Sequence, residues 1–185
     1  VFQEMTDLLV LELVDKGLAT NQVVLTIGYD IENLTDTQRR KNYHGQVTTD
    51  RYGRKIPKHA HGTGNLTEYT SSTRKITECM LRLYDQIIDK NLLIRRITLS
   101  FNHVQNTASI KKQATYEQMD LFTDYKALEN AQKEESKELA REKKLQHAML
   151  DIKKKFGKNA ILKGINLEEG ATARDRNEQI GGHKA

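Results

Sequence analysis

The spacing of apolar residues predicts two amphipathic helices in the first half of the chain. Over residues 2–16, apolar side chains recur every three or four positions, and Gly17 follows where a C-capping glycine ends a helix. The hydroxyl-rich run 70–73 offers N-capping side chains, and apolar residues then recur at helical spacing from Ile76 to Ile88. Each helix therefore has one face that other parts of the protein must cover.

Alternation of apolar and polar residues predicts strands between and after these helices. It is evident over residues 22–30 and clearest over residues 94–104, where Ile97, Leu99 and Phe101 alternate with polar side chains. Residues 62–70 are mostly polar, but their Thr and Tyr content favours a further strand beside the first.

The order helix, strand, strand, helix, strand predicts an α+β fold in which both helices cover one face of a single antiparallel or mixed sheet. It makes up most of the split βαβ arrangement and lacks only a strand ahead of residue 1. The opposite face is then polar and open, which suits phosphate groups as partners, although an ordinary hydrated surface has the same character. The side chains expected there are Thr26, Asn65, Thr67, Arg96, Thr98, Ser100 and Asn102.

Periodicity disappears over residues 31–61, so we expect a long basic loop inserted between two strands. Tyr43 and Tyr52 lie among its charges. Cations neutralise phosphates and rings stack on bases, so the composition favours a nucleic-acid contact, with a solvated insertion as the alternative. The basic residues of the segment are Arg39, Arg40, Lys41, Arg51, Arg54, Lys55 and Lys58.

Three histidines in this segment raise the question of a metal site. His59 and His61 are two positions apart, and His44 is nearby in the sequence. No cysteine or second spaced pair completes a ligand set, so we expect no metal here.

Composition divides the chain into a folded body and an appendage. The net charge is +5, hydrophobic residues make up only 37% and charged residues 30%, so part of the chain is expected to lie outside a core. We expect a body over residues 1–105, a linker over residues 106–123 and a charged helical tail over residues 124–185. Because the chain begins with Val rather than Met, we interpret it as a fragment of a longer protein.

Cysteine usage and hydropathy bear on location. Cys79 is the single cysteine, which excludes a disulfide framework and fits a reducing compartment. No secretory signal and no long apolar run occurs, so we expect a soluble cytoplasmic protein without a membrane partner.

Within the linker, residues 118–122 read Gln118-Met-Asp-Leu-Phe122. Leu121 and Phe122 can anchor a short peptide in a partner's pocket, each contributing roughly 1.5–3 kcal/mol, while the Gln118 amide bonds to the pocket's backbone. The alternative is that both apolar side chains pack on the body's own core.

The tail begins with strong helix formers. Residues 126–156 predict a helix in which Leu145, Met149, Ile152 and Phe156 form a narrow apolar stripe. We expect this stripe to pack on the body, to pair with another chain, or to have a role in the parent protein. We favour docking or pairing over a helix that is solvated on all sides.

Taken together, these features resemble the little-finger domain of a UmuC-type, Y-family translesion DNA polymerase. The resembling segments are Gln22-Val-Val-Leu-Thr-Ile-Gly-Tyr29, Ile94-Arg-Arg-Ile-Thr-Leu-Ser-Phe101 and Gln118-Met-Asp-Leu-Phe122, and the closing segment 171–185 is similar to the end of Gram-positive UmuC-like proteins. The family's first little-finger strand is missing and is expected upstream of residue 1.

The resemblance implies a region that grips template–primer duplex DNA through its sheet and holds a sliding clamp through Gln118, Leu121 and Phe122. Arg95 and Arg96 match a basic pair at the start of the family's last strand. Error-prone lesion bypass in DNA repair and the SOS response is the implied role, with the rest of the polymerase chain as a further partner. A non-enzymatic adaptor that recruits a protein through its tail helix is the alternative.

The resemblance also implies Mg²⁺ chemistry in the parent polymerase. Nucleotidyl transfer of this kind uses carboxylates that hold two metal ions, and no acidic cluster on a strand occurs in this sequence. We therefore expect this region to bind without catalysing, and to need no cofactor of its own.

Overall fold

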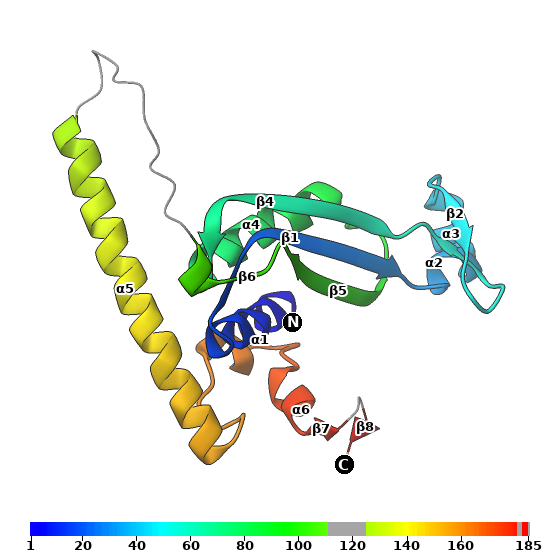
Figure 1. Cartoon of the computed structure of the whole chain (residues 1–185). Coiled ribbons are helices and arrows are strands. Elements are labelled where there is room, and N and C mark those ends of the chain that lie inside the picture. The colour runs from blue at the N-terminus through cyan, green and yellow to red at the C-terminus, as the bar shows by residue number, and fades with distance from the viewer. Residues whose placement is uncertain (111–124, 181–182, 185) are drawn as a thin grey trace.

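The computed structural model describes residues 1–110, 125–180 and 183–184. Its main sheet has the strand order β4 (Ala60–Thr70), β1 (Leu18–Tyr29) and β5 (Ile94–Asn102), and the short β6 (Gln105–Asn106) pairs with the start of β1. Every pairing in this sheet is antiparallel (Figure 1). The expected α+β class is confirmed, with an antiparallel sheet.

The connection from β4 to β5 runs through α4 (Thr73–Ile87). Because β4 and β5 each lie antiparallel to β1, they run parallel to each other with β1 between them. Two parallel strands joined by a helix and separated by a third strand form the split βαβ arrangement.

Two helices, α1 (Phe2–Asp15) and α4, cover the same face of the sheet, as the sequence predicts. Burial of their apolar stripes against the strands supplies the main stabilisation of the body. Ser72 caps α4, since its hydroxyl accepts a hydrogen bond from the backbone N–H of Lys75. The buried core consists of Val10, Leu13, Val23, Leu25, Ile27, Tyr29, Ile76, Cys79, Met80 and Leu83.

Two glycines on β4 let α4 lie close to the sheet. A Cβ atom at Gly62 would approach the Leu83 side chain to 2.8 Å, and one at Gly64 would approach the Cys79 sulfur to 2.8 Å. Both glycines point toward the helices, between the polar residues of the other face. This explains why β4 shows little apolar periodicity although it belongs to a core sheet.

The segment expected as a long loop has structure of its own, so that prediction is wrong. It contains α2 (Glu32–Thr35), α3 (Thr37–Asn42), β2 (Val47–Thr49) and β3 (Lys55–Pro57), and β2 pairs with β3 as a hairpin. Elements of three to six residues are too short to produce a periodic pattern. We call residues 31–58 the insertion.

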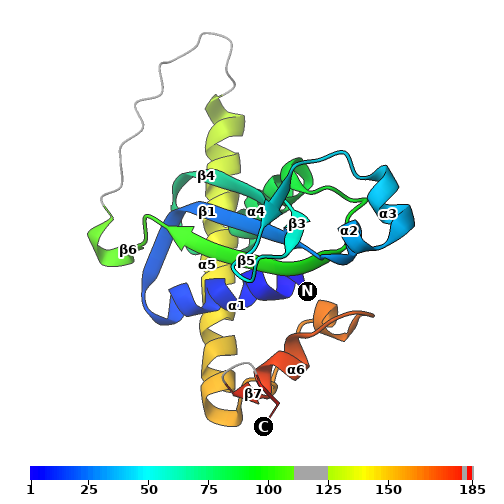
Figure 2. The same cartoon turned by 90° about the vertical axis from the view of Figure 1, so that its right-hand side faces the viewer.

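A single buried amide fixes the insertion to the sheet. The Asn33 side chain donates to the backbone oxygens of Asp30 and Leu93 at 2.9 and 3.0 Å and accepts from the Leu93 N–H at 2.9 Å. Its whole side chain is buried, so these bonds replace water completely. The insertion therefore lies at the end of the sheet where β1 ends and β5 begins, opposite the end that faces α5 (Figure 1, Figure 2).

After β5 the chain continues through a 3₁₀ turn, Thr107–Ser109, to the long helix α5 (Tyr125–Phe156). Further short elements follow: a 3₁₀ turn at Gly164–Leu167, α6 (Ala173–Asn177) and the hairpin of β7 (Gln179–Ile180) and β8 (His183–Lys184). The expected tail helix is confirmed, and β1 begins four residues before its predicted start at Gln22.

The predicted apolar stripe of α5 is only partly right. Met149 is buried, but Leu145 and Phe156 are 60% and 67% exposed. The face that docks on the body also carries polar side chains, because Gln146 is 5% exposed and donates to the Ser71 carbonyl and the Thr73 hydroxyl. A stripe drawn from apolar residues alone misses such a face.

The C-terminal elements are held by a carboxylate of α1. Glu4 is 1% exposed and accepts hydrogen bonds from the Asn166 side chain at 2.9 Å and from the backbone N–H groups of Thr172 and Ala173 at 3.1 and 3.2 Å. Burial raises the pKa of Glu4, but these hydrogen bonds outweigh it and lower the pKa to about 2. The buried group therefore stays ionised.

Candidate functional site

The face of the sheet turned away from the helices is polar, as the sequence predicts. Its residues align across the strands in rows that the pairing register fixes. The first row is a chain of amides, in which Gln22 donates to Asn65 and accepts from Asn102, both at 3.0 Å. We call this side of the three strands the polar face.

The next rows of the polar face carry hydroxyl groups. Val24 lies between Thr63 and Ser100, and Thr26 lies between His61 and Thr98. The Thr26 hydroxyl is 2.9 Å from His61 Nδ1. Thr63, Thr98 and Ser100 are exposed, and no Asp or Glu occurs in these rows, so an anion meets no repulsive charge on this surface.

The row nearest the insertion is basic. Arg96 lies opposite Gly28, and the register of β1 and β5 shifts before Tyr29 pairs with Ile94. Arg95 is the additional residue at this bulge, so two consecutive arginines of one strand are both exposed. Strict alternation would have pointed one of them toward the helices.

The basic residues of the insertion lie just beyond this row. The last turn of α3 carries Arg39, Arg40 and Lys41, and positive charges at this end of a helix interact favourably with the helix dipole. Arg51 and Arg54 belong to the turn of the β2–β3 hairpin, and Lys55 begins β3. The insertion has seven Lys or Arg against three Asp or Glu, which gives a net charge of +4.

Most of these cations lack an acidic partner. Arg95, Arg96 and the seven basic residues of the insertion are all exposed. Within the described part of the chain, Arg54 alone among these nine forms an ion pair, with Asp50 at 2.7 Å. Arg74 and Lys75 on α4 differ, since each pairs with a carboxylate of α5. The end of the polar face at Arg96 and the adjoining insertion therefore carry an excess of exposed positive charge.

The three histidines considered as metal ligands do not form a site together with acidic or cysteine side chains. Over residues 1–110 and the described tail, no group of three His, Cys, Asp or Glu is placed to hold a metal ion. His61 instead bonds to Thr26 on the polar face.

The sequence also predicts a clamp-binding peptide at residues 118–122. Gln118, Leu121 and Phe122 lie outside the described residues.

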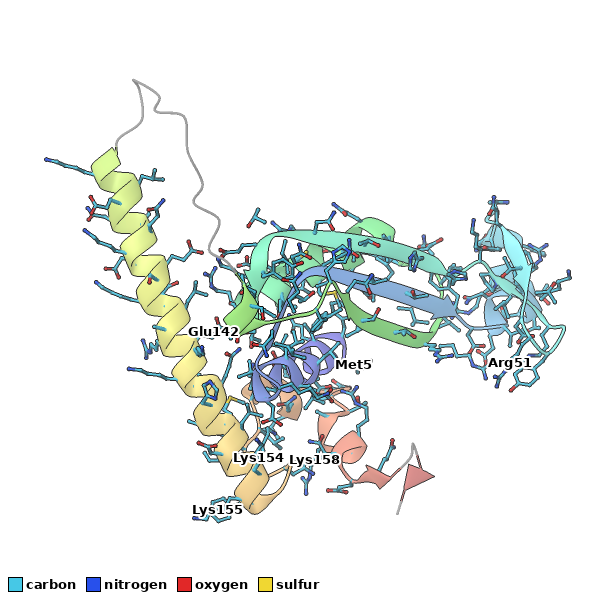
Figure 3. The ribbon with its side chains drawn as sticks, viewed as in Figure 1. Met5, Arg51, Glu142, Lys154, Lys155 and Lys158 are labelled. Carbon is cyan, nitrogen blue, oxygen red and sulfur yellow. The ribbon has the colours of Figure 1, made fainter. Side chains whose placement is uncertain are left out.

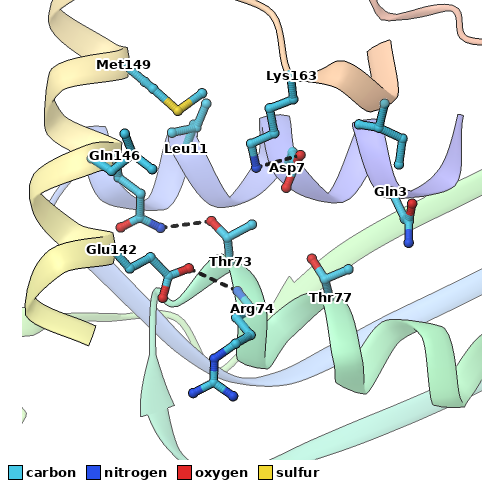
Figure 4. Close-up of a pocket in the computed structure, with 12 residues that line it drawn as sticks. Gln3, Asp7, Leu11, Thr73, Arg74, Thr77, Glu142, Gln146, Met149 and Lys163 are labelled. Atoms are coloured by element: carbon cyan, nitrogen blue, oxygen red, sulfur yellow. Dashed lines mark hydrogen bonds and ion pairs between the residues drawn. The ribbon is translucent and has the colours of Figure 1, made fainter. Parts of the chain in front are cut away.

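A cleft of about 350 Å³ lies on the other side of the molecule, between α1, α4, α5 and the turn near Lys163 (Figure 4). One wall carries the ion pair of Asp7 and Lys163 at 2.8 Å. On the other wall Glu142 accepts from the Arg74 backbone N–H at 3.0 Å and from the Ser72 hydroxyl at 2.6 Å. Since Glu142 caps the start of α4, this cleft marks where the tail helix docks.

Sequence reasoning found most of the polar face but missed several of its members, among them Gln22, Thr63 and His61. Gln22 joins the amides of β4 and β5, and His61 belongs to the hydroxyl rows rather than to a loop. Alternation held the signal for Gln22, which lies four residues before Thr26 on the same side of β1. The start of β4 at Ala60 was hidden by the glycines that follow it.

No helix in the described part of the chain is long and apolar enough to cross a bilayer. Comparison with known proteins finds no matching family model, no matching curated protein and no matching solved structure.

Proposed function

We propose that this chain binds duplex DNA across the polar face, as the DNA-gripping and clamp-tethering region of a cytoplasmic lesion-bypass DNA polymerase. The observation that carries the proposal is the acid-free polar face of β1, β4 and β5, which continues into nine exposed cations of which Arg54 alone is ion-paired. The little-finger-like assignment is supported by the split βαβ order and by the two helices on one face.

The chemistry of the surface fits a phosphate backbone. Hydroxyl and amide groups donate hydrogen bonds to phosphate oxygens, and arginines add charge-assisted, bidentate ones. A broad sheet face suits a long, uniform ligand that is recognised by its backbone. Such contacts position a duplex without reading its sequence, which is what synthesis across many templates requires.

Tethering is the second part of the proposal. A region that holds DNA weakly gains by sharing a clamp with the primer terminus, because a short flexible tether gives an effective concentration on the order of millimolar. Residues 118–122 supply the anchors, and the parent polymerase supplies the catalytic carboxylates and Mg²⁺.

A titration of primed duplex DNA by fluorescence anisotropy tests the binding. The chain is expected to bind more weakly as salt rises from roughly 50 to 200 mM, because each neutralised phosphate contributes about 0.9 to the slope of log K against log salt. A duplex that is not bound, or is bound with no dependence on salt, contradicts the proposal.

One observation favours the second candidate, an adaptor that recruits a protein partner through its tail. Leu145, Phe156 and Leu167 are 60%, 67% and 73% exposed. Exposed apolar side chains mark a protein interface where they form one patch, so these three are the tail residues through which a partner would be held. A tail variant with these three residues replaced by Ser separates the candidates, because it leaves DNA binding intact under the first and removes the partner under the second.

A further inference from the structure

We propose that the turn of the β2–β3 hairpin, residues 50–54, is a separate binding site for single-stranded DNA beside the duplex. This inference rests on the proposed DNA-binding function and adds a second ligand to it. The site consists of Tyr52 and the guanidinium groups of Arg51 and Arg54.

The Tyr52 ring is exposed and lies beside two guanidinium groups. Tyr52 is 65% exposed. The guanidinium carbon of Arg51 lies 4.6 Å from the centre of the Tyr52 ring, and that of Arg54 lies 5.1 Å from it. Arg51 also donates a hydrogen bond to the Tyr52 hydroxyl. Three planar groups thus gather at one point without contributing to the core.

The backbone of the turn is held by hydrogen bonds to Asp50. Asp50 Oδ1 accepts from the backbone N–H groups of Tyr52 and Arg54 at 2.8 and 2.9 Å, and Oδ2 accepts from Arg54 Nε at 2.8 Å. Gly53 has a φ of +80°, which closes the turn at little steric cost. A turn whose backbone is fixed in this way loses little backbone conformational entropy when a ligand binds to it.

The side chains of the turn are of the types that bind unpaired nucleotides. Nucleic-acid bases stack on aromatic rings and on guanidinium planes, and the same guanidinium groups bond to phosphate oxygens. Bases inside a duplex are covered by their neighbours, so a small exposed cluster of this type favours unpaired bases. The ligand class is therefore a single strand, read by stacking and charge rather than by sequence.

The hairpin turn also lies at a suitable end of the polar face. The hairpin belongs to the insertion, which Asn33 fixes at the Arg96 end of the polar face. Arg51 lies at the end of the molecule opposite α5 (Figure 3). A strand that leaves a duplex bound on the polar face at this end would meet the turn, which makes the unpaired template extension the natural occupant.

The test compares three labelled DNAs at one salt concentration by fluorescence anisotropy: a blunt duplex, the same duplex with a short oligothymidine 5′ overhang, and the oligothymidine alone. For Tyr52→Ala we expect affinity for the overhang DNA to fall by about fivefold to 150-fold, the range that loss of one stacked base produces. Tyr52→Phe keeps the ring and should stay within about twofold of wild type. Affinity for the blunt duplex should change by less than about twofold in both variants.

Phe156→Ala is the matched control, because Phe156 is an equally exposed ring with the Lys155 amine 5.2 Å from its centre, on α5. It should leave all three affinities unchanged. Circular dichroism melting should show that Tyr52→Ala folds as wild type does, since the ring lies outside the core.

The outcomes separate this inference from the proposed function. The single-strand site is overturned if Tyr52→Ala binds the overhang DNA as tightly as wild type does. It is also overturned if the variant loses affinity for the blunt duplex by the same factor as for the overhang DNA. In both cases the proposal of duplex binding stands. If wild type does not bind the blunt duplex but binds oligothymidine, and Tyr52→Ala removes that binding, the role of the polar face is overturned and the single-strand site stands. Wild type that binds none of the three DNAs removes both.

Discussion

Arg96 on β5 lies directly opposite Gly28 on β1, and the register between the two strands shifts at the next residue of β1. The shift leaves Arg95 as the extra residue of a bulge, so both arginines are exposed at the end of the sheet that meets the insertion. Bulges often direct side chains at binding surfaces. The arrangement makes this pair the first target for mutation.

Replacing both arginines, Arg95→Gln with Arg96→Gln, should weaken binding of duplex DNA and reduce the salt slope by about two, one unit for each lost phosphate contact. The measurement is an anisotropy titration at several salt concentrations. Lys143→Gln with Lys144→Gln is the matched control, since this adjacent exposed pair lies on α5 and should leave the slope unchanged. An unaltered slope in the arginine variant would show that these side chains do not contact phosphates.

The peptide proposed to bind the clamp, residues 118–122, gives the second prediction. Leu121→Ala with Phe122→Ala should abolish retention of the chain on an immobilised sliding clamp, because each anchor contributes roughly 1.5–3 kcal/mol when buried. Affinity for duplex DNA should be unchanged, since the peptide lies outside residues 1–105. Retention at the wild-type level would exclude this peptide as the tether.

The close approach of α4 to β4 gives the third prediction. Gly64→Ala places a Cβ atom 2.8 Å from the Cys79 sulfur and 3.0 Å from a Val23 methyl group, so the Cys79 side chain or the helix that carries it must shift. Overpacking of this kind should lower the free energy of unfolding by about 1–3 kcal/mol, measured by urea denaturation. Gly164→Ala is the control, because nothing lies within 4 Å of its added Cβ atom. Equal stability of both variants would contradict this account of the core.

The ionised Glu4 gives the fourth prediction. Its pKa is about 2 in the folded protein, below the ordinary value of 4.5, so the unfolded chain binds more protons between these limits and stability falls as pH decreases from about 5 to 2. The loss attributable to Glu4 is roughly 3 kcal/mol, at 1.36 kcal/mol per pKa unit. Thermal melts of wild type and Glu4→Gln across this range measure it. The variant should be less stable at pH 7 and should vary less with pH, whereas parallel curves would contradict the assignment.

Local pattern was enough to predict the two helices and the three long strands of the main sheet. Helical spacing predicted α1 and α4, and alternation in residues 94–104 predicted which side chains of β5 face solvent. These elements are long, and burial of one face dominates their energetics, so the period of the apolar residues carries the information. The polar face followed from the same reasoning, because one sheet face remains when both helices occupy the other.

The remaining features depend on single contacts that no periodic pattern records. Asn33 orders the insertion through bonds to Leu93, sixty positions later in the chain, and Glu4 holds the C-terminal segment through Ala173. The docked face of α5 is defined by Glu142 and Gln146 as much as by Met149. Polar residues of this kind read as solvated in a sequence, and only the partner shows why they are buried.

The most direct test of the account asks which face of the sheet touches DNA. A photo-crosslinker is attached to Thr98→Cys on the polar face or to Gln86→Cys on the exposed side of α4, since both native residues are exposed. The native Cys79 should not react, because it is 5% exposed and burial raises the pKa of its thiol. The account predicts that irradiation with duplex DNA joins the strand to position 98 and not to position 86. Crosslinking from position 86 alone would contradict it.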